Sequence, residues 1–370
     1  MNKQDEMILQ LIKNNTFITE EELVRKTGIT PLKVNEVILS LVQSGQIIGR
    51  SFVLPEEKQT LCIGGANVDW KIQTLKSLSY KTSNPSKSSK SCGGVARNIA
   101  ENLGRLGSKT SLLSFVGSDS EGEWVLKHTK EFVDVSATQT IQGKSTGTYT
   151  AVLDTDGEMA VALADMAIYD EVGESCIDFI LQQVTESRMV LLDTNLPVNI
   201  NQQIIRCCND KKIPLCIATV SAPKIDRLPD SLEGVSWLIA NQKEAEALSG
   251  FEIRTEGDFF RAAEAILKSG VERVVITRGD KGLIYFTKKG EAGVLLPPEI
   301  LITDVTGAGD SLVSGIIFSF LKGLGTVDAC KVGISCSIIT LQSNETVNPS
   351  FNQQKLMETF QTFFSKGVFQ

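Results

Sequence analysis

The residues best suited to chemistry lie in the segment 304–310, Asp-Val-Thr-Gly-Ala-Gly-Asp, which precedes an apolar stretch. Small residues at the start of a predicted helix leave backbone N–H groups uncovered, and the helix dipole adds partial positive charge there. Gly307, Ala308 and Gly309 therefore indicate an anion-binding site. Asp310 allows two interpretations: it could cap the helix, or it could accept a proton from a hydroxyl group that attacks a bound phosphate.

A glycine pair, Gly93 and Gly94, forms a second candidate site at the start of a helix predicted over residues 95–106. Glycines allow a ligand to approach the backbone closely. Asn98, one turn into this helix, could bind a hydroxyl group. The pair alone carries little weight, because most glycine pairs form turns.

Three further polar motifs directly follow predicted strands. Ligands in open α/β sheets collect at the carboxyl ends of the strands, so these motifs are candidate binding positions. Asn241 and Glu244 could hold hydrated Mg²⁺, or they could form an ordinary helix cap. The three motifs are Asn67-x-Asp69, Asn241-x-x-Glu244 and Thr277-x-Gly279-x-x-Gly282.

His128 is the only histidine of the chain, and this limits the possible mechanisms. It lies in the charged segment 121–130, which predicts a solvated surface helix rather than a catalytic base. Acid–base chemistry is therefore expected from a carboxylate. The eight cysteines form no C-x-x-C pair, which predicts reduced, mostly buried thiols rather than a zinc site.

The overall composition predicts an ordinary globular protein of two domains. The chain has 370 residues, of which 42% are hydrophobic and 22% charged. No apolar stretch approaches the roughly 18–20 residues that cross a bilayer, and the first residues do not form a signal peptide. We therefore expect a cytoplasmic protein without a membrane partner. The 37 basic and 44 acidic residues give a net charge of −7, which argues against nucleic-acid binding by the whole protein.

Residues 60–370 predict an α/β domain, because apolar runs alternate with helical segments. This alternation is typical of a mostly parallel sheet that helices cover on both faces. Two regions depart from it: residues 68–91, which are rich in Ser and Lys, and residues 146–165, which form a hairpin pattern around an Asp-Gly turn. Strands inserted there could form a small sheet, called the lid below, that covers a binding site.

Residues 1–55 predict a separate winged helix-turn-helix domain. Three short helical patterns precede a predicted hairpin over residues 46–53, and Pro31 takes the favoured first position of the third helix. That helix would enter the DNA major groove. Duplex affinity comes mainly from cationic side chains, but this segment has six basic and six acidic residues. The segment could therefore be a DNA-binding domain, or it could be a docking or dimerising module.

The combination of these motifs resembles a known family. Residues 60–370 resemble the carbohydrate and nucleoside kinases of the PfkB/ribokinase family, whose two signatures match the segments that contain Asn98 and Asp310. The resemblance implies a ribokinase-like fold with a β lid and transfer of the γ-phosphate of ATP to an alcohol group. It also implies Mg²⁺, activation by K⁺ and a homodimer.

The resemblance further implies a role for each motif. Asp310 would accept the proton of the attacking hydroxyl, while backbone N–H groups around Ala308 stabilise the transferred phosphoryl group. Mg²⁺ would be held through water by Asn241 and Glu244. The implied sugar-binding residues are Asn67, Asp69, Gly93, Gly94 and Asn98; the implied nucleotide-binding residues are Asn241, Thr277, Gly279, Gly282, Gly307 and Gly309; the implied ligands of a monovalent cation are Asp304 and Thr306.

The substrate half is most similar to the family members that convert pseudouridine to pseudouridine 5′-phosphate. One departure is residues 218–221, Ala-Thr-Val-Ser, where those kinases carry Asp-Pro-Val-Ser. The acceptor could therefore also be another nucleoside or ribose. An alternative of a different class is a nucleoside-sensing transcription regulator that has lost turnover; the winged helix favours it, and the intact Asp310 opposes it.

Overall fold

The chain divides into two compact units, Met1–Glu57 and Lys58–Gln370. The computed structural model describes residues 3–47 and 58–364. Each unit buries its own apolar side chains within these described ranges. Across the same residues, no helix is both long enough and apolar enough to span a bilayer.

The described part of the N-terminal unit consists of helices around a small core. Thr19 caps the second helix through a capping box, and Gly28 ends that helix in the left-handed conformation at φ 68°. Ile8 and Leu23 are buried where the helices meet. The predicted hairpin over residues 46–53 lies mostly outside the described residues, so the wing remains a prediction. The helices are α1 (Lys3–Asn14), α2 (Glu20–Thr27) and α3 (Pro31–Gln43).

The larger unit is built on an eight-stranded sheet, which confirms the predicted mostly parallel α/β architecture. Six neighbouring strands are parallel, and two antiparallel strands complete one edge. The parallel strands are continuous apolar runs, as expected where both faces of a sheet are buried. In sheet order the strands are β14 (Ala292–Leu295), β13 (Leu283–Thr287), β12 (Arg273–Thr277), β11 (Val235–Asn241), β10 (Leu215–Ala218), β9 (Met189–Asp193), β1 (Thr60–Ile63) and β4 (Thr110–Leu113).

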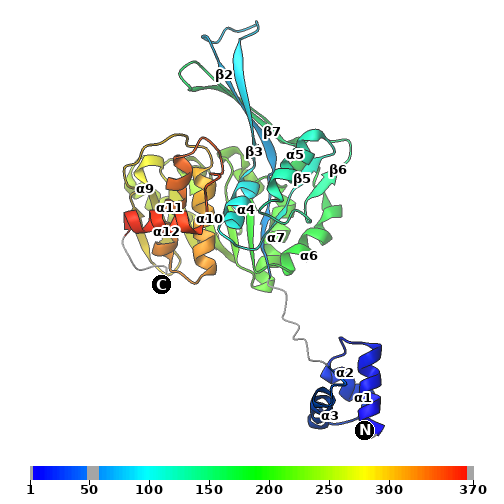
Figure 1. The fold of residues 1–370 in the computed structure, drawn as a ribbon. Coiled ribbons are helices and arrows are strands. Elements are labelled where there is room, and N and C mark those ends of the chain that lie inside the picture. Colours follow the sequence, from blue (N-terminus) through cyan, green and yellow to red (C-terminus); the bar gives the residue numbers. More distant parts are fainter. Residues whose placement is uncertain (1–2, 48–57, 365–370) are drawn as a thin grey trace. The chain divides into compact units, whose positions relative to one another are not determined.

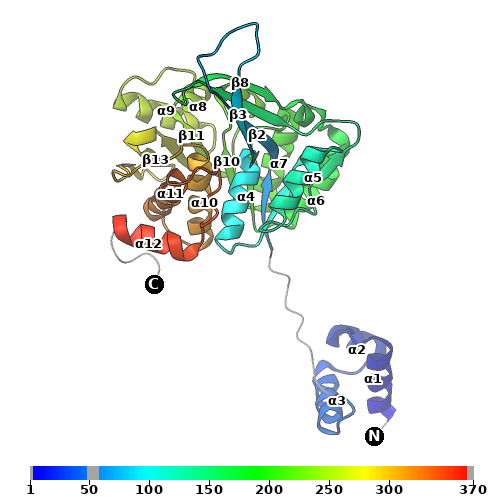
Figure 2. The same ribbon diagram turned by 45° about the horizontal axis from the view of Figure 1, so that its top comes forward.

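Helices cover both faces of this sheet (Figure 2). Successive strand side chains point to opposite faces, so Leu61 and Ile63 join one core cluster whereas Cys62 joins the other. The first cluster includes α6 (Ile177–Thr185), α7 (Val198–Lys211), α8 (Gln242–Ser249) and α9 (Glu256–Lys268). The second includes α4 (Val95–Arg105), α10 (Ala308–Leu321), α11 (Thr326–Leu341) and α12 (Gln353–Phe364).

The lid is a separate four-stranded sheet that projects from the α/β body (Figure 1). Its central strands pair in parallel although they are distant in sequence, and the hairpin predicted over residues 146–165 forms one of its edges. Every residue of the edge strand Met159–Asp165 is exposed. In sheet order the lid strands are β3 (Ser86–Gly93), β2 (Asn67–Thr74), β7 (Thr148–Leu153) and β8 (Met159–Asp165).

The apolar run over residues 111–116 predicts a single buried strand, and this prediction is wrong because the run is divided between two sheets. The chain leaves the main sheet at Ser114, whose hydroxyl donates a hydrogen bond to the carbonyl oxygen of Gly64 at 2.6 Å. Apolar runs do not reveal such a change of sheet. The second half becomes β5 (Phe115–Gly117), which pairs with β6 (Gln139–Ile141) and leads into α5 (Ser120–Thr129).

Two predictions about single residue types are confirmed. His128 is exposed on α5, where its ring Nδ1 contacts the carbonyl oxygen of Trp124 at 2.7 Å. All eight cysteines are free thiols, and five of them are buried. The remaining helical turns are short 3₁₀ segments: Ala167–Glu171, Glu174–Cys176, Ala222–Arg227 and Gly279–Lys281.

Candidate functional site

A pocket lies where the carboxyl ends of the parallel strands meet the first turns of α4 and α10. Side chains at the ends of β10, β11 and β12 contribute to its wall, as the topology of a parallel sheet requires. Residues from three of the five sequence motifs, distant in the chain, therefore border one space. Its polar lining includes Thr219, Asn241, Glu244, Thr277, Gly309 and Asp310.

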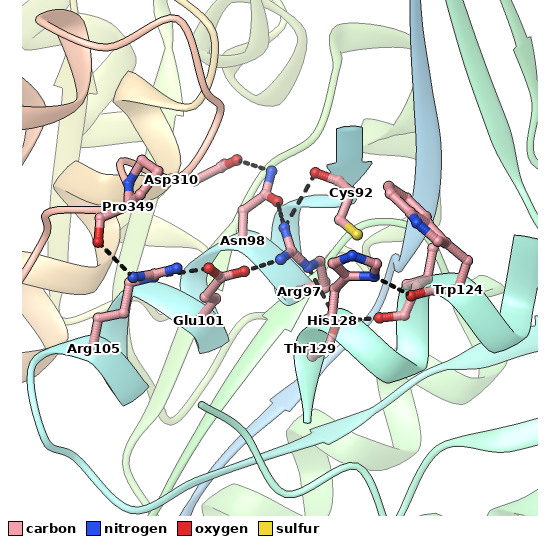
Figure 3. Close-up of polar contacts among 11 residues, drawn as sticks. Cys92, Arg97, Asn98, Glu101, Arg105, Trp124, His128, Thr129, Asp310 and Pro349 are labelled. Atoms are coloured by element: carbon pink, nitrogen blue, oxygen red, sulfur yellow. Dashed lines mark hydrogen bonds and ion pairs between the residues drawn. The ribbon is translucent and has the colours of Figure 1, made fainter. Parts of the chain in front are cut away.

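Asp310 lies in the first turn of α10 and points toward α4 (Figure 3). Its Oδ2 accepts a hydrogen bond from Nδ2 of Asn98 at 2.8 Å. Burial raises the pKa of Asp310 to about 7; the hydrogen bond from Asn98 and the charge of Arg97 oppose this rise, whereas the charges of Asp193 and Asp69 add to it. The carboxyl group therefore titrates near neutral pH although part of its surface borders the pocket.

The start of α10 is open on the side of the pocket. Gly307 precedes the helix at φ 80°, and no side-chain hydrogen bond caps it, so Asp310 does not act as the cap. A Cβ at Gly307 would lie 2.0 Å from the carbonyl oxygen of Thr346, which only glycine avoids. A Cβ at Gly309 would meet no heavy atom within 4 Å. Since the first N–H groups of a helix lack intrahelical acceptors, this open turn is suited to an anion.

The predicted sugar-binding residues form a tight cluster beside the pocket. Nδ2 of Asn67 donates a hydrogen bond to Oδ1 of Asp69 at 2.6 Å. Burial raises the pKa of Asp69 to about 6 against the lowering effect of this hydrogen bond. A Cβ at Gly93 would lie 2.2 Å from Oδ1 of Asp69, and a Cβ at Gly94 would collide with the backbone of the loop after β1. The glycine pair therefore makes room for a carboxylate and a neighbouring loop.

Asn241 and Glu244 form a complete capping box at the start of α8. Nδ2 of Asn241 donates to Oε1 of Glu244 at 2.7 Å, and the hydroxyl of Thr219 donates to Oε2 at 2.5 Å. Burial raises the pKa of Glu244 despite these hydrogen bonds. The cap interpretation is thus correct, but both residues also line the pocket. Their oxygen atoms suit Mg²⁺ held through water, because Mg²⁺ retains several of its water ligands.

The motif Thr277-x-Gly279-x-x-Gly282 mainly shapes a turn, and only its first residue lines the pocket. Thr277 ends β12 and borders the pocket. Gly279 and Gly282 do not line it; they flank the following turn with φ values of 62° and 78°. A Cβ at Gly282 would lie 2.0 Å from the carbonyl oxygen of Leu295, so this glycine permits close packing against β14.

Asp304 and Thr306, the predicted ligands of a monovalent cation, already have partners. Oδ1 of Asp304 accepts hydrogen bonds from the backbone N–H and the hydroxyl of Thr306 at 2.8 and 2.7 Å. Its Oδ2 forms an ion pair with Nζ of Lys71 from lid strand β2. Burial acts to raise the pKa of Asp304, but the bonds from Lys71 and Thr306 outweigh it and lower the pKa. A monovalent cation would have to displace the Lys71 ammonium, so these residues do not fit such an ion as arranged.

Sequence reasoning missed several residues beside the site, among them Asp193 at the end of β9. Its buried carboxylate accepts hydrogen bonds from the backbone N–H of Gly65 at 2.8 Å and from Nδ2 of Asn195 at 2.9 Å. Burial raises its pKa. Lys224 contacts Asn195 from the neighbouring segment. The strand-end rule applied to β9 would have found Asp193, whereas nothing in the local sequence marks Lys224.

The chain is similar to known kinases in both sequence and structure. A family model described as pfkB family carbohydrate kinase matches residues 57–353. The uncharacterized sugar kinase YeiI of Escherichia coli (strain K12) is 28% identical over 355 residues, which cover 95% of this chain and 97% of the relative. A pseudouridine kinase of the same organism is 32% identical over 298 residues, 80% of this chain and 95% of the relative. The structure of a carbohydrate kinase from Agrobacterium tumefaciens matches with a TM-score of 0.69 at 28% identity, covering 82% of this chain and 97% of that one.

Proposed function

This chain belongs to the pfkB family of carbohydrate kinases, and from this we propose that it phosphorylates the 5′-hydroxyl of a nucleoside, with pseudouridine as the preferred acceptor. Family membership makes it a phosphotransferase with an alcohol group as acceptor. The relative at 32% identity, which is named pseudouridine kinase, supports the choice of substrate. The relative that spans 95% of the chain is named only as a sugar kinase.

The position of Asp310 is the observation that carries the proposal. Its carboxylate stands at an open helix start, bonded to Asn98 on one side and bordering a pocket with Asn241 and Glu244 on the other. A pKa of about 7 suits a general base, since such a base works best when it titrates near the working pH. One carboxyl group thus lies between the proposed hydroxyl-binding and nucleotide-binding residues.

The proposed mechanism uses the residues as they are arranged. Asp69 and Asn98 would bind the ribose hydroxyls, because a carboxylate and an amide together accept and donate hydrogen bonds. Asp310 would take the proton of the 5′-hydroxyl as it attacks the γ-phosphate of ATP. The first-turn N–H groups of α10 would bind the oxygens of the transferred phosphoryl group, and most of the acceleration is expected from this positioning and charge stabilisation.

The side chains around α8 would serve the nucleotide. Asn241 and Glu244 would hold Mg²⁺ through water, and the ion would neutralise charge on the phosphates. Thr277 would lie along the bound ATP at the end of β12. The lid strands would exclude water, which competes with the acceptor hydroxyl for the phosphoryl group.

Substitution of the proposed base tests the reaction. Asp310→Asn is expected to lower kcat by about 10²–10⁴-fold, the usual contribution of a general base. Binding of the nucleoside, measured by calorimetry, should persist, since Asn keeps the size of the side chain. Phosphorylation at a near-normal rate by this variant would refute the assigned role.

A panel of acceptors tests the substrate. Initial rates with pseudouridine, uridine, adenosine and ribose at equal concentrations should give the highest kcat/KM for pseudouridine. Equal values for all nucleosides would refute the pseudouridine proposal and leave the kinase assignment in place. Saturable nucleoside binding without turnover of any acceptor would instead favour the regulator alternative.

The exposed face of the lid supports a homodimer. Val161 and Leu163 lie two positions apart on β8, so they share one face, and they expose 44% and 62% of their surface. An apolar strand of this kind is an aggregation hazard unless a partner covers it. If the lids of two copies meet there, Leu163→Asp should halve the mass measured by light scattering.

A further inference from the structure

Arg97, the residue before Asn98, is a buried cation beside the proposed active site. Arg97 exposes 4% of its surface, and its partner Glu101 exposes 5%. Its guanidinium Nη1 donates to Oδ1 of Asn98 at 2.9 Å and to the carbonyl oxygen of Cys92 at 3.1 Å, and Nε donates to the hydroxyl of Thr129 at 3.2 Å. Its Nη2 forms an ion pair with Glu101 (Figure 3).

The contact between Arg97 and Asn98 fixes which end of the Asn98 amide faces Asp310. A guanidinium group can only donate hydrogen bonds, so the amide end that meets Arg97 must be the oxygen. The NH₂ end must then face Asp310, whose Oδ2 lies 2.8 Å away. A flipped amide would place NH₂ against the guanidinium and oxygen against the carboxylate, which loses both bonds.

The direction of this bond matters for the state of Asp310. An amide N–H that donates to a carboxylate favours the ionised form, and the ionised form is the one that can accept a proton. The charged groups that face Asp310 are Asp193 from β9, Asp69 from β2 and Arg97 from α4. Both neighbouring carboxylates raise the pKa of Asp310, so the donor from Asn98 and the charge of Arg97 oppose them.

Arg97 is itself held in place by a second arginine through a shared carboxylate. Oε1 of Glu101 accepts a hydrogen bond from Nε of Arg105 at 2.8 Å. Nη1 of Arg105 donates to the carbonyl oxygen of Pro349 at 2.9 Å, in the loop after α11. A chain of hydrogen bonds and ion pairs therefore runs from Asp310 along one side of α4 to the carbonyl oxygen of Pro349 (Figure 3).

We infer that Arg97 is a positioning residue, which orients the Asn98 amide so that its NH₂ group donates to Asp310 and keeps that carboxylate a proton acceptor. The inference rests on the proposed function for its catalytic meaning. The orientation itself is a property of the folded chain and can be measured without turnover.

Titration of the Asp310 carboxyl carbon by NMR tests this role directly. In protein labelled with ¹³C-aspartate, the resonance is assigned by its loss in Asp310→Asn. Arg97→Met should raise the titration midpoint of Asp310 by about one pH unit or more, since it removes a nearby positive charge and frees the amide. Arg97→Lys, which keeps the charge and one donor, should give a smaller shift. An unchanged midpoint in Arg97→Met would overturn the inference.

A matched control separates this effect from general loss of packing. Arg273 is a partly buried arginine at the start of β12, the end of that strand away from the site, and it stacks on Trp237. Arg273→Met should lower the melting temperature and leave the midpoint of Asp310 unchanged. A shift in this control equal to that of Arg97→Met would also overturn the inference.

A double-mutant cycle separates amide orientation from charge alone. In an Asn98→Ala background, the shift caused by Arg97→Met should shrink, because there is no amide left to orient. A shift of the same size in both backgrounds would show that Arg97 acts only through its charge and would refute the positioning role. If Arg97→Met does not fold, Arg97→Lys takes its place in the cycle. Absence of kinase activity would refute the proposed function alone, because the titration does not require turnover.

Discussion

At the scale of single residues, the protonation state of Asp310 governs the expected pH dependence. Its folded-state pKa is about 7, and only the ionised carboxyl can accept a proton. The value of kcat/KM should therefore fall as the pH decreases through about 7, with a slope of one on a logarithmic scale. Initial rates between pH 5.5 and 9 measure this, and a flat profile below pH 7 would contradict the assignment.

The same pKa gives a prediction for stability with the opposite sign. Because the pKa of Asp310 is higher in the folded state than in the unfolded chain, protonation of this carboxyl increases the free energy of unfolding. The full contribution to stability is present below the usual pKa of aspartate, near 4. This contribution is lost as the pH rises to about 7. Asp310→Asn, which cannot ionise, should therefore melt at a higher temperature than the natural chain at pH 8. At pH 4 the two melting temperatures should converge.

Gly93 offers a residue-scale test of the sugar side. In Gly93→Ala the new Cβ would lie 2.2 Å from Oδ1 of Asp69, so that carboxylate must move. We expect KM for the nucleoside to rise by about tenfold or more, since displacement of a binding group by 1 Å can cost 10²-fold. Gly173→Ala is the matched control, because a Cβ there would meet no heavy atom within 4 Å. Equal KM values in both variants would contradict the placement of Asp69 against the substrate.

At the scale of elements, an ion pair connects the lid to the segment 304–310, which precedes and begins α10. Lys71 on β2 meets Asp304, and the two side chains expose 38% and 22% of their surface. Lys71→Met removes the connection and leaves Asp304 without a cation. We expect KM for both substrates to rise about threefold to tenfold, the effect of roughly 1 kcal/mol on a partly exposed pair.

The freed carboxylate also gives a prediction about monovalent cations. In Lys71→Met, K⁺ should raise activity and melting temperature relative to choline at equal ionic strength, because the ion can then reach Asp304. The natural chain should respond less. Lys87→Met is the control, since Lys87 is an exposed lysine of the same lid on β3. A K⁺ response equal in all three proteins would refute the idea that Lys71 occupies this position.

At the scale of the whole molecule, the two compact units suggest separable roles. Their described residues form separate cores, so each unit buries its own apolar surface. A chain that begins at Lys58 should therefore keep kcat/KM within about twofold of the full chain. Loss of activity in a shortened chain that still melts cooperatively would show that the N-terminal unit is needed for turnover.

The N-terminal unit itself is shared with a relative. The alignment that covers 95% of the chain is longer than Lys58–Gln370 alone permits, so it must include much of this unit. DNA binding by this unit stays a proposal, and duplex affinity of the full chain at 50 and 200 mM salt tests it. Affinity through phosphate contacts should fall steeply with salt. Affinity absent at both salt concentrations would leave docking or dimerisation as its role.

Local patterns were sufficient to locate most of the fold. Continuous apolar runs identified the parallel strands, and glycine-rich segments after strands and before helices identified the starts of α4 and α10, because backbone geometry and helix dipoles act over a few residues. The division at Ser114 was missed, since a bond to the distant Gly64 defines it.

The electrostatic arrangement of the site could not be read from such patterns. Asn98 and Asp310 are 212 positions apart, and Lys71 and Asp304 are 233 apart, yet each pair is in contact. Burial beside other carboxylates, rather than residue type, raises the pKa of Asp310 to about 7. Residue chemistry and short-range spacing are written along the chain, whereas the distances and the dielectric surroundings that tune charges arise once distant segments have packed together.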